Sequence, residues 1–589
     1  MKLFNVSLCP ENQLIGVVVD NHVYPLSASD VTSSVLYTGQ APIANVGYRY
    51  ACISKDKHVI VSQEDFIRMP VRGADRTLNE HYERSWNQKP LNSIPTTMAP
   101  LACIHRITSD LHIEGEIPTI HFFGNQSLID LVHANQGDDV KIKVNMTYIS
   151  PHVIKHFPKV TFAISGHSTR FFAKTSYKFK TPEGESLFGY QHLKLRSIST
   201  DKTFMRDSLA YSIAESIGLP SSGHSYVRVY INHQAVGLFG LAEMFKKPWV
   251  RNEMSFGNRN RHLGALYVAD ISGGRKMKPP RKGSPPPPPD DCYHSKPPSG
   301  DCPPDGQPPE NCCHDGPPFG QGSFGPPGSK PDRTNHGRRS DLSYLGDDVH
   351  LYDAGYYKVK ADSARGHANF TRLMELTQFI SEQYNLTQID NSVVPLWHRK
   401  IDMDSLLRMI ALEIVISNSD GYLTMANNYI LYDDYTTDRI VFSAQDFDLT
   451  MGSAIQNAML LHNGNYTVFP GFLSRPVTAS LMRIPKFKKE LEDLIYKLVK
   501  ELVNREVLTP RIESLKDFLL EDVIWDQGLP RLGSPAHRSG VDEDTTMDPK
   551  TVFLKAIYGP SNISRSMSLY DWIDYRSANL LNFLSKHGK

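Results

Sequence analysis

The first hundred residues alternate short apolar runs with turns. Residues 16–20, 21–25 and 58–62 contain β-branched and aromatic side chains and are bounded by Gly, Pro, Asn and Asp, which is the pattern of β-strands. No apolar stripe repeats there at the three- to four-residue spacing of a helix. Residues 1–103 are therefore predicted to form a small β-rich, sandwich-like domain.

A second series of strands follows and is interrupted by one helix. The predicted strands are residues 119–123, 140–148, 160–164, 176–180, 225–231 and 235–243. Between the fourth and fifth strands, apolar residues recur at four-residue spacing: Met205, Leu209, Ile213 and Ile217. Gly218 and Pro220 end this helix, and residues 232–234 form the turn of a hairpin. Sheet, helix and hairpin in this order are typical of an α+β domain.

The second half of the chain is richer in helical patterns. Helices are predicted at residues 368–384, at 402–418 with Asp404 as N-cap, and at 486–503. Before them, residues 273–340 contain a run of five prolines and repeated Pro-Pro and Gly-Pro steps, a composition that cannot build a core. We predict a disordered Pro/Gly/Cys-rich insertion within a domain that spans residues 104–589.

Acidic and amide side chains gather between the last two predicted helices. A helix delivers Asp420 into a loop, Asn427 and Asn428 precede a strand, and a second strand presents Asp446 and Asp448 at its end. Two carboxylates at i and i+2 can share a cation, and an amide adds a neutral oxygen ligand. Each motif alone has a simpler interpretation, namely a turn pair, a strand cap and outward-facing strand residues. Their clustering favours a functional site.

The order of these residues resembles the order of catalytic parts in protein kinases. Phosphoryl transfer needs oxygen ligands for Mg²⁺, a carboxylate aimed at the attacking hydroxyl and a lysine that holds the phosphates. The spacing matches loosely, because kinases place the amide ~5 residues after the catalytic Asp, whereas Asn427 and Asn428 follow Asp420 more distantly. Asp446-Phe447-Asp448 also replaces Asp-Phe-Gly, and no Gly-x-Gly-x-x-Gly loop is visible.

The required lysine is expected on the strand at residues 176–180. Lys178 is the first choice, and Lys174 and Lys180 are its alternatives. A solvent-facing strand lysine is the simpler interpretation of each. Glu215 on the following helix and Glu243 at the end of the hairpin are candidate partners for the lysine.

Composition places the chain among ordinary globular proteins, with 40% hydrophobic and 22% charged residues. The formal net charge is +1, so no overall field attracts nucleic acid, and no nucleic-acid partner is expected. No apolar run approaches the ~20 residues that a membrane-spanning helix needs, so no transmembrane segment is predicted. Neither a signal peptide nor a GPI-anchor signal is visible in this chain.

The cysteines and sequons favour a secreted or cell-surface glycoprotein. Four of the seven cysteines lie in the Pro/Gly-rich segment, which cannot bury thiols, so we expect disulfides in an oxidising compartment; a metal-binding tract is the alternative. Cys9 and Cys52 are a candidate disulfide of the N-terminal domain. Seven Asn-x-Ser/Thr sequons agree with secretion; they lie at Asn5, Asn125, Asn145, Asn369, Asn385, Asn465 and Asn562.

From residue 104 onward the chain resembles the CotH (spore coat protein H) kinase family. The matching pieces are Gly-His-Ser-Thr-Arg-Phe-Phe-Ala-Lys-Thr-Ser-Tyr-Lys at 166–178, Met-Arg-Asp-Ser-Leu-Ala-Tyr at 205–211, Gly-Leu-Phe-Gly-Leu-Ala-Glu at 237–243, Asn-Ser-Asp-Gly-Tyr at 418–422 and Gln-Asp-Phe-Asp-Leu-Thr-Met-Gly at 445–452. The resemblance implies an atypical protein-kinase-like fold that uses ATP and Mg²⁺ or Mn²⁺ to phosphorylate serines of a protein substrate.

The resemblance also implies roles for individual residues. Asp420 would act in the catalytic loop, while Asn428 and Asp446 would hold metal with support from Asp448. Lys178 would contact the phosphates.

The N-terminal β-rich domain and the Cys-rich insertion look similar to surface CotH proteins of mucoralean fungi, which serve as invasins. That similarity implies a first alternative function, a non-catalytic adhesin that binds a host-cell receptor on a kinase-like scaffold. A structural spore-coat or cell-wall component, whose metal site only stabilises folding, is the second alternative.

Overall fold

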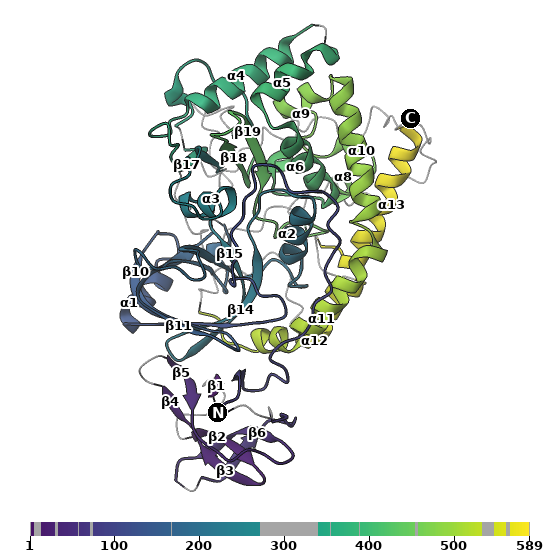
Figure 1. Cartoon of the computed structure of the whole chain (residues 1–589). Helices are drawn as coiled ribbons and strands as arrows, with labels where there is room; N and C mark the ends of the chain where they lie inside the picture. Colours follow the sequence, from purple (N-terminus) through teal and green to yellow (C-terminus); the bar gives the residue numbers. More distant parts are fainter. Residues whose placement is uncertain are drawn as a thin grey trace, which may run out of the picture.

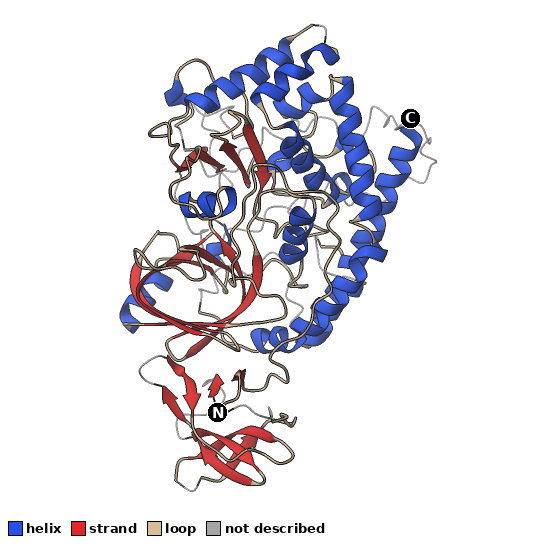
Figure 2. Cartoon of the chain, viewed as in Figure 1, coloured by secondary structure: helices blue, strands red, loops and turns tan. Residues whose placement is uncertain are grey.

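The structure, a computed structural model, describes residues 2–4, 13–29, 33–56, 58–70, 75–166, 168–270, 340–353, 355–387, 389–453, 458–532, 547–560 and 566–587. Strands dominate the first half of the chain and helices the second, with a β-rich region at the N-terminal end, as expected for an α+β protein (Figure 2). Nearly all of the predicted insertion, residues 273–340, lies outside the described residues. No helix in the described parts combines the length and apolar character that a bilayer span requires.

The N-terminal strands form two four-stranded sheets at one end of the molecule (Figure 1). One sheet has the order β3-β2-β6-β7, and the other has the order β4-β5-β1-β8. Cys52 in the first sheet is disulfide-bonded, and Cys9, its predicted partner, lies outside the described residues. The eight strands are β1 (Lys2–Phe4), β2 (Gln13–Val19), β3 (His22–Pro25), β4 (Ser27–Ser29), β5 (Ser33–Thr38), β6 (Tyr48–Ser54), β7 (Ile60–Gln63) and β8 (Asn79–His81).

The next strands close into a barrel with the order β10-β11-β12-β13-β15-β14-β9. Aromatic and aliphatic side chains fill its interior, among them Phe122, Phe179 and Leu195. The hairpin predicted at residues 232–234 joins β14 to β15, and Asn232 adopts a left-handed conformation there. The barrel strands are β9 (Thr119–Phe123), β10 (Ile142–Ile149), β11 (Ile154–Ser165), β12 (Ser176–Lys180), β13 (His192–Arg196), β14 (His224–Ile231) and β15 (Gln234–Glu243).

Helices pack outside the barrel and dominate the C-terminal half. Helix α1 (Gln126–Ala134) lies against β10 and β11, and α2 (Arg206–Ser216) lies against β14. The predicted N-cap at Asp404 is wrong, because the N-cap is Asp402, two residues earlier, whose side chain accepts from the Ser405 N–H at 3.0 Å. Asp404 instead pairs with Arg408 at 2.6 Å.

A further sheet and the remaining helices complete the fold. Strands β16 (Leu266–Ala269), β17 (Tyr357–Ala361), β18 (Tyr429–Asp433) and β19 (Ile440–Ala444) form a sheet of order β17-β16-β18-β19. The long helices α10, α11 and α13 run along one side of the molecule (Figure 1). The helices are α3 (Lys247–Met254), α4 (Thr371–Asn385), α5 (Val394–Lys400), α6 (Met403–Val415), α7 (Tyr422–Met425), α8 (Ala458–Leu461), α9 (Pro476–Leu481), α10 (Pro485–Glu501), α11 (Arg505–Gln527), α12 (Pro549–Tyr558) and α13 (Leu569–His587).

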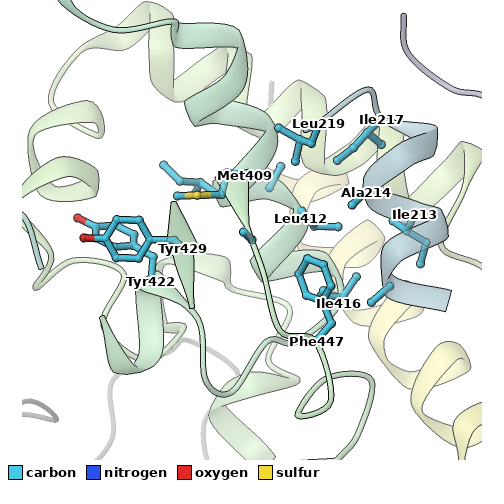
Figure 3. Close-up of a cluster of buried hydrophobic side chains, with 14 of the residues drawn as sticks. Ile213, Ala214, Ile217, Leu219, Met409, Leu412, Ile416, Tyr422, Tyr429 and Phe447 are labelled. Carbon is cyan, nitrogen blue, oxygen red and sulfur yellow. The ribbon is translucent and has the colours of Figure 1, made fainter. Parts of the chain in front are cut away.

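One large apolar core joins α2 of the barrel region to α6 of the helical region. Ile213 from α2, its C-cap residue Ile217 and Leu412 from α6 belong to one buried cluster, and Phe447 lies in it as well (Figure 3). Phe447 is fully buried. Because its neighbours in sequence are Asp446 and Asp448, burial of this ring fixes the positions of both carboxylates.

The buried histidines should make the folded protein less stable in acid. Burial lowers the pKa of His121 and of His462 to about 4, whereas an unfolded histidine titrates near 6.5. The unfolded chain therefore binds more protons between these values, and stability falls as the pH is lowered from about 6.5 toward 4. His462→Leu should reduce the slope of melting temperature against pH in that window. The exposed His367→Leu is the matched control, and equal slopes for wild type and His462→Leu would contradict the prediction.

Candidate functional site

The loop after α6 holds Asp420 in a fixed position. The buried Glu413 carboxylate accepts from the Tyr422 and Leu423 N–H groups, each at 2.8 Å, and so anchors the start of α7. On the other side of the loop, the Ser419 N–H donates to the Leu449 carbonyl at 3.0 Å. The loop that carries Asp420 is thereby tied to the segment that carries Asp446 and Asp448.

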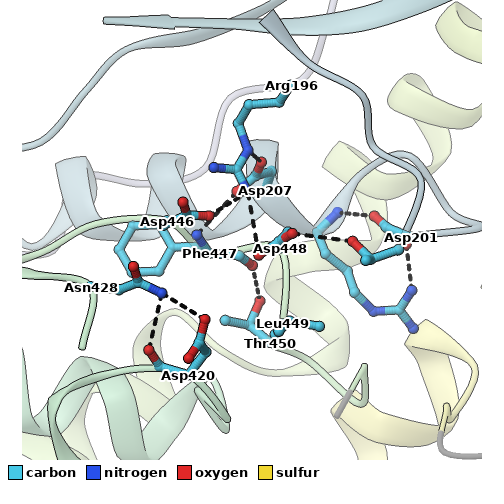
Figure 4. A network of polar contacts seen from close by, with 12 residues as sticks. Arg196, Asp201, Asp207, Asp420, Asn428, Asp446, Phe447, Asp448, Leu449 and Thr450 are labelled. Carbon is cyan, nitrogen blue, oxygen red and sulfur yellow. Dashed lines mark hydrogen bonds and ion pairs between the residues drawn. The ribbon is translucent and has the colours of Figure 1, made fainter. Parts of the chain in front are cut away.

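Two amides hold the Asp420 carboxylate. The Asn428 Nδ2 donates to Asp420 Oδ2 at 2.8 Å and to the Asp420 carbonyl at 3.1 Å (Figure 4). The Asn427 Nδ2 donates to Asp420 Oδ1 at 3.4 Å. Since both bonds of the Asn428 amide nitrogen point to Asp420, its Oδ1 faces elsewhere and is available as a neutral oxygen ligand.

Asp446 follows β19 in a left-handed backbone conformation with φ 61°. A residue with a Cβ seldom adopts this conformation, and such residues gather at functional sites. The same strand end is joined to the Asp420 loop, because the Gln445 N–H donates to the Asn428 carbonyl at 2.8 Å. The backbone therefore turns Asp446 toward the site at a cost that the surrounding contacts offset.

Two cations from β13 meet the Asp446 carboxylate. Lys194 Nζ lies 3.1 Å from Oδ2, and Arg196 Nη2 lies 2.5 Å from Oδ1. The same Arg196 nitrogen lies 3.3 Å from Asp448 Oδ1, and the Thr200 hydroxyl donates to Asp448 Oδ2 at 3.2 Å. One strand of the barrel thus supplies the positive charge for both carboxylates of the 446–448 segment.

Arg196 also pairs with Asp207 of α2 through its Nε. The Phe447 N–H donates to the other Asp207 oxygen at 3.2 Å (Figure 4). Asp207 therefore connects α2, β13 and the segment of Asp446 and Asp448. Among kinases an ion pair between a strand cation and a helix carboxylate occupies a comparable place next to the metal-binding Asp.

The charges of the cluster perturb one another. Burial, followed by the nearby Asp448 and Asp446, raises the pKa of Asp420 to about 7. Burial also raises the pKa of Asp207 to about 7 against the attraction of Arg196. The pKa of Asp446 is lowered instead, because Arg196 and Lys194 outweigh the effect of burial. Carboxylates with such different pKa values side by side are characteristic of functional sites.

The structure brings together four of the predicted site residues and separates three. Asp420, Asn428, Asp446 and Asp448 share the network described above. Lys178 instead lies 2.6 Å from Asp139. Glu215 is largely exposed and pairs with Arg106 at 3.1 Å, while the buried Glu243 accepts from Ser222 and contacts His112 at 3.4 Å.

The lysine of the cluster is thus Lys194, one strand away from the predicted Lys178. The two residues are direct partners across β12 and β13, so they lie on the same face of neighbouring strands. Neither Glu215 nor Glu243 is the carboxylate that pairs with the strand cation; Asp207 is. The signal that points to these residues is the alternation His-Leu-Lys-Leu-Arg at 192–196, a half-buried strand with its cations on one face, directly before a helix.

Comparisons with known proteins find similarity over most of the chain. A family model described as CotH kinase protein covers residues 162–527. A Rhizopus delemar protein named invasin CotH3 is 24% identical over 95% of this chain and 80% of its own length. Spore coat protein homolog 1 of Rhizopus delemar is 21% identical over 80% of this chain and 64% of its own length.

A bacterial relative matches a shorter stretch. Inner spore coat protein H of Bacillus subtilis is 28% identical over 21% of this chain and 33% of its own length. The family model, in contrast, spans more than half of the chain and includes β12, β13, α2 and every carboxylate of the cluster. The chain therefore belongs to the CotH kinase protein family.

Proposed function

We propose that the chain is an atypical protein kinase that transfers the γ-phosphate of ATP to serine hydroxyls of a protein substrate. The observation that carries this proposal is the network of Asp420, Asn428, Asp446 and Asp448 beside the cations of β13. A base candidate, metal-ligand candidates and phosphate-binding cations are the parts that phosphoryl transfer requires.

The donor set fits a divalent cation that is shared with phosphate oxygens. Among the described residues, no three His, Cys, Asp or Glu side chains converge closely enough to hold a metal on their own. Mg²⁺, however, is commonly held by one or two carboxylates together with substrate phosphates. Asp446, Asp448 and the Asn428 Oδ1 would supply the protein ligands, and after burial the nearby Asp448 and Asp446 contribute to the raised pKa of Asp420. When bound, Mg²⁺ or Mn²⁺ would neutralise negative charge on the phosphates.

In the proposed reaction, Asp420 accepts the proton of the attacking serine hydroxyl. The serine Oγ forms a bond to the γ-phosphorus as the bond from that phosphorus to the bridging oxygen of ADP breaks. A carboxylate with a pKa of about 7 is well matched to proton transfer near neutral pH. Asn427 and Asn428 orient this carboxylate through their amide N–H groups.

Lys194 and Arg196 have different tasks in this arrangement. The Lys194 side chain contacts Asp446 but is 21% exposed, so its ammonium can turn to a phosphate. Arg196 is 7% exposed and is surrounded by three carboxylates. We assign Lys194 to the phosphates and Arg196 to the positioning of the Asp446 and Asp448 segment.

Asp446→Asn tests the metal assignment. Removing this charge should abolish metal-dependent ATP binding, measured by calorimetry, and should lower γ-phosphate incorporation roughly 100-fold or more, the scale for loss of one electrostatic stabiliser. The matched control is Asp438→Asn, a charge removal at a side chain that is 62% exposed. Normal ATP binding by a folded Asp446→Asn variant would refute the assignment.

Asp420→Asn separates the base from the metal site. The variant keeps the shape of the side chain but cannot accept a proton, so we expect ATP binding within a few-fold of wild type. The single-turnover transfer rate should fall by about 10² to 10⁴, the usual contribution of a general base. A transfer rate that is unchanged in Asp420→Asn would show that another group takes the proton.

An adhesive function is the second candidate, and one surface feature favours it. Exposed apolar side chains gather along one edge of the sheet β3-β2-β6-β7 and in the loop before β6; they are Ile43, Val46, Val59, Val61, Ile67 and Met69, each at least 52% exposed. Soluble proteins seldom expose so many neighbouring apolar residues outside an interaction site. Several relatives are named invasins, and this edge is a candidate contact with a receptor protein.

A pair of charge insertions tests the adhesive edge. Val46→Glu with Met69→Glu should lower binding of the fluorescently labelled chain to animal-cell monolayers several-fold, because carboxylates oppose burial of the apolar edge. Leu473→Glu, at an exposed apolar residue of the helical region, should have no effect. If the edge variant binds normally while deletion of residues 273–340 removes binding, the contact lies in the insertion and not on this edge.

A further inference from the structure

A separate cavity lies where three parts of the molecule meet. Its volume is about 930 Å³, which is in the range of ~300–1,000 Å³ typical of small-molecule sites. Its described lining comes from the residues after β8, from α1, from the β14–β15 hairpin and from the end of α11. Figure 1 shows α1, β14 and α11 around the end of the barrel that faces the N-terminal strands. None of the described lining residues belongs to the cluster around Asp420.

Apolar and aromatic side chains form the inner wall of this cavity. Tyr82, Ile129 and Ile231 are each less than 4% exposed and line it. Trp525 and Ile524 line it from α11, and Ile524 remains 39% exposed. A ligand that enters the cavity would therefore bury an apolar body against rings and branched side chains.

Three carboxylates surround this apolar wall. They are Glu83, Asp130 and Glu521, and each comes from a different one of the converging parts. Glu521 accepts from the backbone N–H and hydroxyl of Ser85, at 2.8 and 2.6 Å, and both of these donors are neutral. Burial and then the neighbouring Glu64 raise the pKa of Glu83, against the attraction of Arg228.

The positive charge in the lining is already engaged. Arg228 is the one Lys or Arg among the described residues that line the cavity. It is 2% exposed, its Nε lies 2.6 Å from Asp522, and its guanidinium lies 4.2 Å from the centre of the Trp525 ring. Burial lowers the pKa of the lining His133. The cavity therefore presents net negative charge to a ligand.

We propose that this cavity binds a small amphipathic organic cation, an ammonium or guanidinium group on an apolar stem. The carboxylates of Glu83, Asp130 and Glu521 would face the charged group, and the apolar wall would cover the stem. Aromatic rings strengthen such a site, because the faces of Trp and Tyr attract cations. Arg228 on Trp525 shows that this ring already takes part in one such contact.

Calorimetry on the full chain with three matched probes tests the charge preference. The probes are 4-phenylbutylamine, 4-phenylbutanol and 4-phenylbutanoate, which share an apolar stem and differ in charge. We expect the amine to bind at one site, with affinity at least tenfold above that of the alcohol, and the carboxylate to bind more weakly still. Added salt should weaken amine binding, since the rim carboxylates are accessible to solvent. Equal affinities for amine and alcohol, or no amine binding at millimolar concentrations, would overturn the proposal.

Variants locate the binding site. Glu83→Gln combined with Glu521→Gln should lower amine affinity tenfold or more, whereas Glu506→Gln, at an exposed carboxylate of the same helix, should not. Ile524→Lys places an ammonium at the cavity and should block the amine without removing any carboxylate, which guards against loss of folding in the double variant. Unchanged amine binding in Ile524→Lys and in the double variant would show that the amine binds elsewhere.

Discussion

A single buried guanidinium holds the candidate site together. Arg196 lies on β13 of the barrel and forms ion pairs with Asp207 of α2 and with Asp446 and Asp448. A buried arginine is costly without partners, and three carboxylates would repel one another without it. Because each charge needs the others, the barrel, α2 and the segment after β19 can take only one relative arrangement at this point.

The Asp420 carboxylate has different surroundings from those of Asp446. Asp446 is stabilised as a carboxylate by Arg196 and Lys194, whereas Asp420 receives only amide N–H groups and faces the negative charge of its neighbours. Two acids in one site with pKa values moved in opposite directions can take different chemical roles. The division that we propose, into a charge-holding Asp446 and a proton-accepting Asp420, rests on these surroundings and not on the residue type.

The sequence predicted the acidic cluster because its members lie close together along the chain, on a loop and at a strand end. Periodicity gives the face of a strand but not which strand lies beside a distant loop. It therefore could not show that Lys194 contacts Asp446 while Lys178 contacts Asp139. Helix α11 was missed for a local reason, since Pro510 interrupts the pattern near its start. Pairing across hundreds of residues, as between Arg196 and Asp446, has no local signature.

Helix α11 connects the cavity to the barrel through two carboxylates one turn apart. Asp522 lies 2.6 Å from Arg228, and Asp526 lies 2.6 Å from Lys174. A Cβ at Gly237 would come within 2.1 Å of the Asp526 carboxylate, so the helix packs directly on the strand backbone and only glycine fits there. Lys174 lies just before β12, and β12 is next to β13, the strand that carries Lys194 and Arg196. A shift of α11 at the cavity would therefore move this part of the barrel wall or break a buried ion pair. Because a close-packed interior transmits strain, α11 forms a continuous packed connection between the cavity and the barrel wall beside the carboxylate cluster.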